Sequence, residues 1–314
     1  MSADRYPVGY EDIKVVAMIT SPEAGHGSAP HAAERAMDQF TKRGVDVVAM
    51  QGNSPERAQG LIREAIKDER FDALVACGGD GMINLALQEQ AESGIPLGVI
   101  PSGTGNDHAR EYRLPSNDAA AAADVIADGF TVTTDLGRIT GEGQDPLWFG
   151  TIMCAGFDSL VSDRVNRMRW PHGRNRYNLA IVLEFLNFHA LPFTITLDDG
   201  TVLDEDIILA AFGNTKSYGG GMNICPDADH SDGLLDITVI GRANRFKAAA
   251  VFGKVFSGKH VDFREVAQYR SRSARVEFRG DERMNAYADG DFMAPVPVTV
   301  EVVPRAGRYI VPRP

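Results

Sequence analysis

The stretch 73–81, ALVACGGDG, places a continuous apolar run directly before a turn of glycines and one aspartate. Such a run is typical of a β-strand that is buried on both faces of a parallel sheet. Glycine weakens strands and helices, so its value after the strand is close backbone approach and freedom in the φ angle. The stretch 97–107, LGVIPSGTGND, has the same arrangement, with a short apolar strand followed by a glycine-rich turn. Two such units predict a sheet with a ligand-binding edge.

Strand and helix signals alternate around these two stretches. Ser54 followed by Pro55 is a strong helix start, with serine as N-cap and proline in the first turn. We predict strands at 13–19, 45–50, 73–77 and 97–100, and helices at 29–42, 54–67, 81–93 and 119–128. The alternation predicts an α/β domain with a parallel, Rossmann-like sheet and helices on both faces.

The pattern changes after about Phe130, where short β-type stretches dominate. They lie at 131–137, 147–155, 193–197, 207–212, 234–240, 275–278 and 296–303, with helical patterns at 177–189 and 246–256. Many short strands separated by glycine and aspartate turns predict a mostly antiparallel β-sandwich. We therefore expect an α/β domain at 1–135 and a β-rich domain at 136–303, with a cleft between them and a tail, 304–314, that packs back on the first domain.

Composition excludes several classes of protein. The 314 residues carry a formal net charge of −11, with 44% hydrophobic and 24% charged residues, which is ordinary for a soluble globular chain. An acidic balance argues against a general nucleic-acid binder, so we expect no nucleic-acid partner. Three widely spaced cysteines favour reduced thiols in a cytoplasmic protein. The first twelve residues do not resemble a secretory signal, and no apolar run approaches the ~20 residues of a membrane span.

A third glycine-rich turn, 21–28 (SPEAGHGS), follows the first predicted strand. Ligands of α/β sheets bind at the carboxyl ends of the strands, where helix N-termini present amide groups. Three such turns at one edge predict a polyphosphate cradle of backbone N–H groups and hydroxyls, with Asp80 able to face a magnesium ion. Neither a P-loop pattern nor a complete dinucleotide fingerprint is present.

These turns resemble the signatures of the diacylglycerol kinase catalytic fold, a superfamily that includes sphingosine kinases and bacterial lipid kinases. GGDG at 78–81 is shared with NAD kinases and phosphofructokinases, and its combination with PSGTGND at 101–107 is much more specific. The resemblance continues through AGFD at 155–158, the block 219–236, and Asp-Gly-Asp at 289–291, where the family has Asp-Gly-Glu.

The resemblance implies an ATP site along the edge of the first domain. Its residues would be Ser21, Gly25, Gly27, Gln51, Gly78, Gly79, Asp80, Gly81, Met82, Ser102, Gly103, Thr104 and Asn106. Asp80 would help to hold nucleotide-bound Mg²⁺. Three positions depart from the family: Ser21 stands for Asn, Met82 for Thr and Asp291 for Glu.

The resemblance also implies a structural Mg²⁺ and a catalytic base in the second domain. The metal would be held by Asp229, Asp232 and the backbone carbonyl of Leu234. The base that takes the proton from the substrate hydroxyl would be Asp289 or Asp291. Without the family, an Asp-Gly pair between strands is also an ordinary hairpin turn.

Two further segments are candidates for contact with a lipid. The apolar stretch 177–189 is either a buried core helix or one wall of an acyl-chain pocket. Five arginines between 164 and 176 flank Trp170, and form either a solvated loop or a patch for anionic headgroups.

These observations lead to one hypothesis and two alternatives. The hypothesis is an ATP- and Mg²⁺-dependent lipid kinase that phosphorylates a hydroxyl of diacylglycerol or a related lipid, a cytoplasmic enzyme that touches the inner membrane face during turnover. The alternatives are a kinase of a soluble acceptor, such as NAD or a sugar derivative, and a nucleotide-binding regulator without turnover. The sequence leaves a homodimer open.

Overall fold

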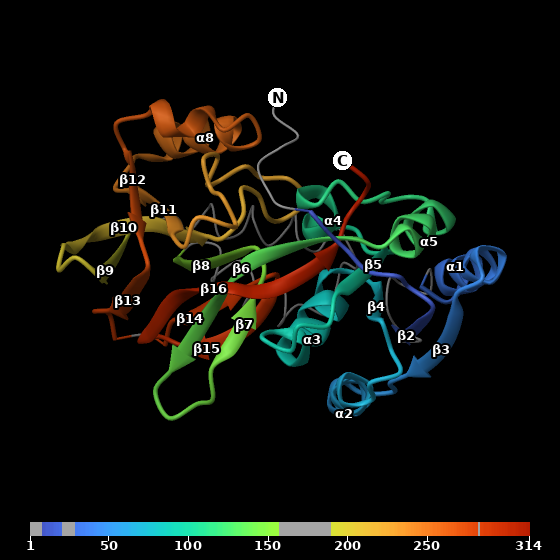
Figure 1. The fold of residues 1–314 in the computed structure, drawn as a ribbon. Helices are drawn as coiled ribbons and strands as arrows, with labels where there is room; N and C mark the ends of the chain where they lie inside the picture. Colours follow the sequence, from blue (N-terminus) through green and yellow to red (C-terminus); the bar gives the residue numbers. More distant parts are fainter. Residues whose placement is uncertain (1–7, 21–28, 157–189, 282) are drawn as a thin grey trace.

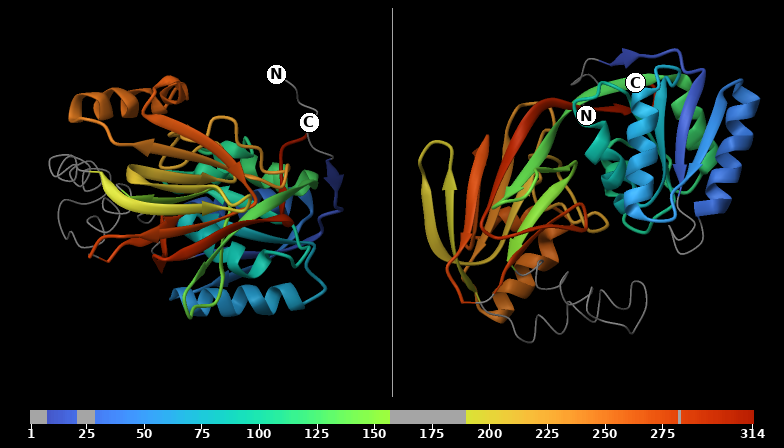
Figure 2. Two further views of the ribbon diagram at one scale, coloured as in Figure 1. Left: turned by 90° about the vertical axis from the view of Figure 1, so that its left-hand side faces the viewer. Right: turned by 90° about the horizontal axis from the view of Figure 1, so that it is seen from below.

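A computed structural model describes residues 8–20, 29–156, 190–281 and 283–314. The chain forms two lobes, an α/β domain and a β-rich domain, which lie side by side (Figure 1; Figure 2, right). The predicted segments 21–28, 157–158, 164–176 and 177–189 lie outside the described residues.

The first domain is built on a parallel sheet in the order β3-β2-β4-β5. These strands are β2 (Val15–Thr20), β3 (Asp46–Gln51), β4 (Ala73–Gly78) and β5 (Leu97–Pro101). Every residue of β4 and β5 is buried, which explains their unbroken apolar sequences. The predicted parallel sheet is therefore confirmed.

Helices cover both faces of this sheet. One face packs against α2 (Pro55–Lys67) and α3 (Asp80–Gln90), and the other against α1 (Ala29–Arg43) and α5 (Ala119–Asp128). Ser54 caps α2 by accepting a hydrogen bond from the Arg57 amide at 3.2 Å, as the Ser-Pro pair predicts. A short helix that we did not predict, α4 (Asp107–Glu111), follows the turn after β5.

The second domain is mostly antiparallel, as predicted. Its strands are β6 (Phe130–Gly141), β7 (Leu147–Phe149), β8 (Ile152–Gly156), β9 (Leu191–Leu197), β10 (Val202–Gly213), β11 (Leu235–Gly241), β12 (Val266–Ser271), β13 (Ser273–Phe278), β14 (Asn285–Ala288), β15 (Asp291–Pro295) and β16 (Val298–Ile310). Helix α8 (Arg245–Val255) and the 3-10 helix η2 (Lys259–Asp262) follow β11. Apolar side chains from β8, β9, β10, β13 and β16 meet in one core, typical of a sandwich.

Two long strands, β6 and β16, run through both domains. They pair with each other from Val298↔Gly141 to Ile310↔Thr131, with one register shift between Val303 and Gly307. Beyond the shift, Tyr309 of β16 pairs in parallel with Leu97 of β5. The last strand of the chain thus extends the sheet of the first domain. A two-residue strand, β1 (Gly9–Tyr10), pairs with the start of β6.

Candidate functional site

The carboxyl ends of the parallel strands form one edge, as their register shows. Thr20, the last residue of β2, pairs with Gln51 on one side and Cys77 on the other, and Gly78 pairs with Pro101. The turns that follow β4 and β5 therefore start side by side. This places Gln51 and the two glycine-rich turns on the edge that the sequence predicts.

The two turns touch backbone to backbone at Gly79 and Gly103. A Cβ added to Gly103 would lie 2.6 Å from the Gly79 Cα, and one added to Gly79 would lie 3.1 Å from the Gly103 Cα. The Ser102 amide also donates to the Gly78 carbonyl at 2.9 Å. Glycine is needed here because a side chain would push the turns apart.

Replacing Gly103 with alanine should therefore damage the edge without altering the hydrophobic core. If this edge binds ATP, as the resemblance implies, we expect the KM for ATP to rise about tenfold or more, since displaced amides position a phosphate poorly. The matched control is Gly60→Ala on α2, where an added Cβ meets nothing within 4 Å. This control should leave KM unchanged and stabilise the protein slightly. Steady-state kinetics with varied ATP measure both, and equal KM values for the two variants would contradict the prediction.

Asn106 supports its own turn. It lies in the left-handed region with φ +51°, its Oδ1 accepts from the Gly103 amide at 3.1 Å, and its Nδ2 donates to the Gly103 carbonyl at 3.0 Å. Thr104 between them is exposed, whereas Met82 is partly buried against the first core. The Asn106 side chain therefore shapes the turn, and the exposed Thr104 hydroxyl remains available to a ligand.

Helix α3 begins at this edge with Gly79 as its N-cap, and no side chain caps it. Asp80, its first residue, accepts a hydrogen bond at Oδ1 from the Asp107 amide at 2.9 Å. A Cβ on Gly105 would approach Asp80 Oδ2 to 2.6 Å, so that turn also packs tightly. An uncapped helix start beside two glycine-rich turns is a ready anion-binding arrangement.

Asp107 joins the first domain to the second. Its carboxylate accepts from the Gly220 amide at 2.9 Å and the Gly221 amide at 3.1 Å, and it pairs with Arg110. Burial raises the pKa of Asp107, although the hydrogen bond from Gly220 opposes this. The glycines of the 219–221 block all have positive φ angles, a conformation that favours glycine and that presents the Gly220 and Gly221 amides to Asp107.

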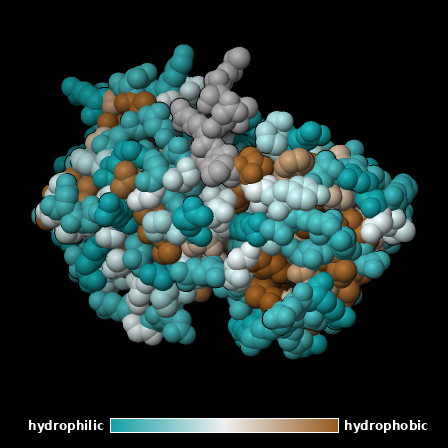
Figure 3. All heavy atoms as spheres, in the orientation of Figure 1, coloured by the Kyte–Doolittle hydropathy of each residue, from teal (hydrophilic) through white to brown (hydrophobic). Residues whose placement is uncertain are grey.

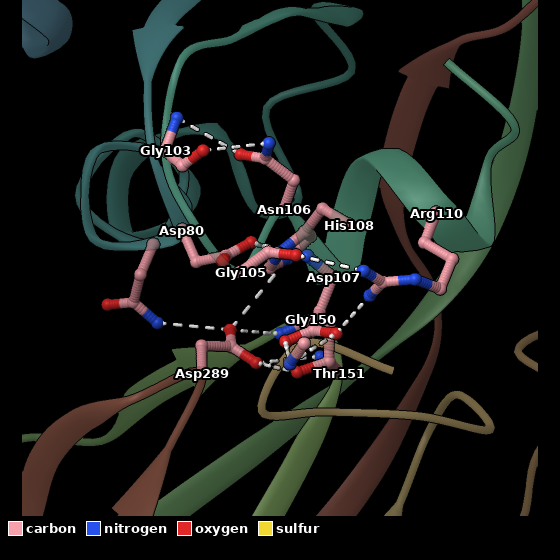
Figure 4. A network of polar contacts seen from close by, with 12 residues as sticks. Asp80, Gly103, Gly105, Asn106, Asp107, His108, Arg110, Gly150, Thr151 and Asp289 are labelled. Carbon is pink, nitrogen blue, oxygen red and sulfur yellow. Dashed lines mark hydrogen bonds and ion pairs between the residues drawn. The ribbon is translucent and has the colours of Figure 1, made fainter. Parts of the chain in front are cut away.

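His108, which we did not predict, lies between carboxylates of the two domains (Figure 4). Its side chain is 1% exposed, with Nδ1 3.6 Å from Asp80 Oδ1 and Nε2 3.8 Å from Asp289 Oδ2. Burial alone would lower the pKa of His108, but the charges of Asp289 and Asp80 raise it overall. In turn, burial would raise the pKa of Asp80, and the interaction with His108 lowers it overall.

Asp289 is fully buried at the domain junction and accepts several hydrogen bonds. Its Oδ1 accepts from the amide and the hydroxyl of Thr151, and its Oδ2 accepts from the Gly150 amide at 2.8 Å and from Asn84 Nδ2 at 3.1 Å. Asn84 belongs to α3, so this carboxylate joins the helix to the second domain. Figure 4 shows Asp289 with its partners Gly150 and Thr151. A Cβ on Gly150 would lie 2.4 Å from His108 Nε2, which explains the glycine there.

Asp291, two residues later, has a different environment. Its side chain is exposed, and its Oδ2 lies 3.5 Å from where a Cβ on Gly81 would be. It therefore faces the start of α3 across the junction. Partial desolvation by the surrounding protein, reinforced by the charges of Asp289 and Asp80, raises the pKa of Asp291 to about 6. A carboxylate with this pKa can accept a proton at neutral pH.

The loop predicted to hold a structural Mg²⁺ has a different counter-charge in this structure. The Arg270 guanidinium pairs with Asp232 and, at 3.3 Å, with Asp236. The second oxygen of Asp232 accepts from the Leu234 amide at 3.0 Å, and Asp229 Oδ1 accepts from the Ser231 amide and hydroxyl. In the described part of the chain, no group of three or more acids, histidines or cysteines is arranged around a metal position. Both oxygens of Asp232 are engaged, so the donor set does not fit a metal as it stands, and the Mg²⁺ site stays a prediction.

Neutralisation of this loop by Arg270 and neutralisation by a metal ion predict different effects of a chelator on the melting temperature. If the guanidinium neutralises the loop, EDTA should leave the melting temperature unchanged. Arg270→Met should destabilise the protein by about 1–3 kcal/mol, because the buried Asp236 would lose its partner. The loss is limited because Arg270 and Asp232 are partly exposed to solvent, which weakens their ion pair. Thermal unfolding with and without EDTA tests this, with Arg272→Met as the control. A drop in melting temperature on chelation of the wild-type protein would instead assign the loop to a metal.

The structure thus brings together most of the predicted residues on the described part of the chain. Gly78 to Met82, Ser102 to Asn106 and the 289–291 turn meet at one junction, with Gln51 farther along the same edge. Asp229, Asp232 and Leu234 lie in a separate loop of the second domain. Ser21, Gly25 and Gly27 fall outside the described residues.

Comparisons with known proteins match both domains of the chain. Residues 15–139 match the family model described as "Diacylglycerol kinase catalytic domain", and residues 151–311 match "YegS C-terminal NAD kinase beta sandwich-like domain". A protein named diacylglycerol kinase from Mycobacterium tuberculosis is 48% identical over 302 residues, covering 96% of both chains. One with the same name from Bacillus subtilis is 26% identical over 289 residues, covering 91% of this chain and 92% of the relative.

A solved structure shares the fold. The crystal structure titled as a diacylglycerol kinase from Bacillus anthracis aligns with a TM-score of 0.76 at 22% identity, covering 95% of this chain and 96% of the other. Together the two family models extend over both domains, and the mycobacterial relative is aligned over nearly the full length. This chain belongs to the diacylglycerol kinase catalytic-domain family.

Proposed function

We propose that this protein is an ATP- and Mg²⁺-dependent lipid kinase that transfers the γ-phosphoryl group of ATP to a hydroxyl of diacylglycerol or a closely related lipid. The observation that carries the proposal is the position of Asp291, which faces the uncapped start of α3 across the domain junction. A carboxylate opposite an anion-binding helix start can hold a hydroxyl in line with a phosphate.

In this proposal the first domain binds MgATP as a substrate. The amides of the 78–82 and 102–106 turns and the Thr104 hydroxyl bind phosphate oxygens, and the Asp80 carboxylate faces the nucleotide's magnesium ion. The lowered pKa of Asp80 suits this role, because the carboxylate stays ionised at neutral pH. Phosphoryl transfer needs mainly positioning and charge neutralisation, which backbone amides and a metal-bearing substrate supply.

The second domain supplies the proton acceptor. Asp291 takes the proton of the lipid hydroxyl as the oxygen attacks the γ-phosphorus, and ADP leaves with the electrons of the broken P–O bond. Asp289 acts as a positioning residue, since its oxygens are engaged with Gly150, Thr151 and Asn84. The two acids that sequence alone left equivalent thus receive different roles.

The choice of lipid rests on the relatives. Those cited above carry the name diacylglycerol kinase, and the mycobacterial one covers both domains at 48% identity. Of the described helices, none is long and apolar enough to span a membrane.

Phosphoryl transfer can be measured directly. The protein is incubated with radiolabelled ATP, Mg²⁺ and either dioctanoylglycerol, sphingosine, NAD or glycerol, and the products are extracted. We expect label in phosphatidic acid. Label in a water-soluble product would instead support a kinase of a soluble acceptor. ATP binding without consumption for any acceptor would point to a regulator.

A further inference from the structure

Helix α8 presents an apolar face to solvent. Phe246 is 90% exposed and Phe256, its C-cap, 65% exposed. Between them, Ala249, Ala250 and Gly253 are also exposed. These positions follow the i, i+3, i+4, i+7 spacing of one helix face, and ten residues of helix place the two phenylalanines about 15 Å apart.

The opposite face of α8 already fills the core. Ala248, Val251 and Val255 are buried. They pack with apolar residues of β8 and β10 and of the loop 224–228. A helix on the surface of a soluble protein normally turns polar residues outward. The outer face of α8 therefore carries an apolar stripe that stays exposed, and Figure 3 shows hydrophobic spheres among hydrophilic ones at the upper left, where α8 lies.

The charge around this stripe is opposite to that of the whole protein. Residues 237–261 contain no acid and five basic side chains, in a chain of net charge −11. Lys247 pairs with Glu265, and Arg242 pairs with Asp206. Within the described chain, Lys254 and Lys259 are exposed and form no ion pair, so they flank the stripe as unneutralised cations.

Helix α8 and the glycine-rich edge of the first domain lie on the same side of the molecule. The parallel strands of the first domain run toward the side of the molecule on which α8 lies (Figure 2, right). The glycine-rich turns at the carboxyl ends of those strands and helix α8 are therefore on the same side of the molecule. A flat partner that lies against α8 would also lie near the edge where phosphoryl transfer is proposed.

We infer that α8 is the docking surface of this protein on anionic lipid bilayers. Phe246 and Phe256 insert at the level of the headgroups, and Lys254 and Lys259 pair with lipid phosphates. A second copy of the chain fits less well, because a two-fold contact through α8 would bring together two faces that each carry the exposed cations Lys254 and Lys259. This inference deepens the proposed function, since a lipid kinase must reach a substrate that resides in a membrane.

The experiment is flotation of the protein with vesicles of phosphatidylglycerol and phosphatidylcholine that contain no diacylglycerol. Wild-type protein should float with anionic vesicles and dissociate as salt rises. Phe246→Ser combined with Phe256→Ser should weaken binding at least tenfold, because about 25 cal/mol is lost for each Å² of apolar surface left in water. The matched control is Val202→Ser, which changes another exposed apolar residue, on β10.

Charge reversal provides an independent arm. Lys254→Glu with Lys259→Glu should abolish the preference for anionic over neutral vesicles, whereas Lys42→Glu with Lys67→Glu should retain it. Activity on soluble dioctanoylglycerol should be unchanged in all four variants, since none is in the proposed catalytic site. Circular dichroism checks that each variant is folded.

The outcomes separate this inference from the proposed function. Wild-type protein that fails to float, or a phenylalanine variant that floats normally, would overturn the docking surface even if phosphate reaches dioctanoylglycerol. Normal flotation that depends on α8 would support the docking surface even if no lipid is phosphorylated. If the phenylalanine variant instead turns a dimer into a monomer by light scattering and still floats, the stripe binds a second copy and the inference is wrong.

Discussion

Asp289→Asn is expected to lower kcat at least about a thousandfold and to destabilise the protein. The Asp289 carboxylate accepts hydrogen bonds from Gly150, Thr151 and Asn84, and an amide has only one acceptor oxygen. Its NH₂ group would face N–H donors in a buried site, at a cost of about 3–5 kcal/mol. α3 and the second domain would then lose their shared anchor.

Thermal unfolding and single-turnover transfer to dioctanoylglycerol measure the two effects. We expect the melting temperature to fall by several degrees together with the rate. Asp199→Asn, at an exposed turn, is the control and should change neither. If Asp289→Asn abolishes transfer while the melting temperature stays at the wild-type value, Asp289 acts on the substrate directly and is not a positioning residue.

Asp291→Asn is also expected to cause a large loss of rate, but with a gain in stability where Asp289→Asn causes a loss. Loss of a general base lowers kcat by about 10²–10⁴-fold. ATP affinity should change little, because the nucleotide is bound by the first domain in the proposed arrangement. If Asp291→Asn retains more than about a tenth of the wild-type rate, Asp291 is not the base and Asp289 is assigned that role instead.

The gain in stability should depend on pH. The pKa of Asp291 is raised to about 6, above the ~3.9 of an unfolded aspartate, so the folded state binds the proton more tightly. The cost of ionising Asp291 is therefore absent below about pH 4, grows between pH 4 and 6, and is complete above pH 6. Asp291→Asn should raise the melting temperature at pH 7.5 and leave it unchanged near pH 4. Wild-type kcat/KM should fall as pH drops through about 6, when the base is protonated.

The edge of the first domain could be predicted from the sequence because its signals are local. A buried strand followed by glycines determines the position of each turn, and parallel strands align their carboxyl ends. Ser54 as the N-cap of α2 is a local signal as well. Each of these features is encoded within a few neighbouring residues.

The side-chain contacts at the junction could not be predicted because the residues that make them are distant in sequence. Asn84 and Asp289 are 205 residues apart, and Thr151 and Asp289 are 138 apart. His108 follows directly after the Gly103–Asp107 turn, and that adjacency was the one signal available. Its place between two acids depends on how the domains pack. The different burial of Asp289 and Asp291, which separates their roles, likewise depends on the hairpin's position against α3.

The path of β16 has a consequence for the order in which the protein can fold. Tyr309 of β16 pairs with Leu97 of β5, so β16 covers one edge of the first domain's sheet. β16 is synthesised about 200 residues after β5, and ribosomes add ~5–20 residues per second. Until then the β5 edge offers unpaired amides and carbonyls to other chains. A ribosome-bound chain that ends near residue 140 should therefore be protease-sensitive and prone to aggregate. Its glycine-rich edge becomes durable only after β16 has emerged from the ribosome and paired with β5.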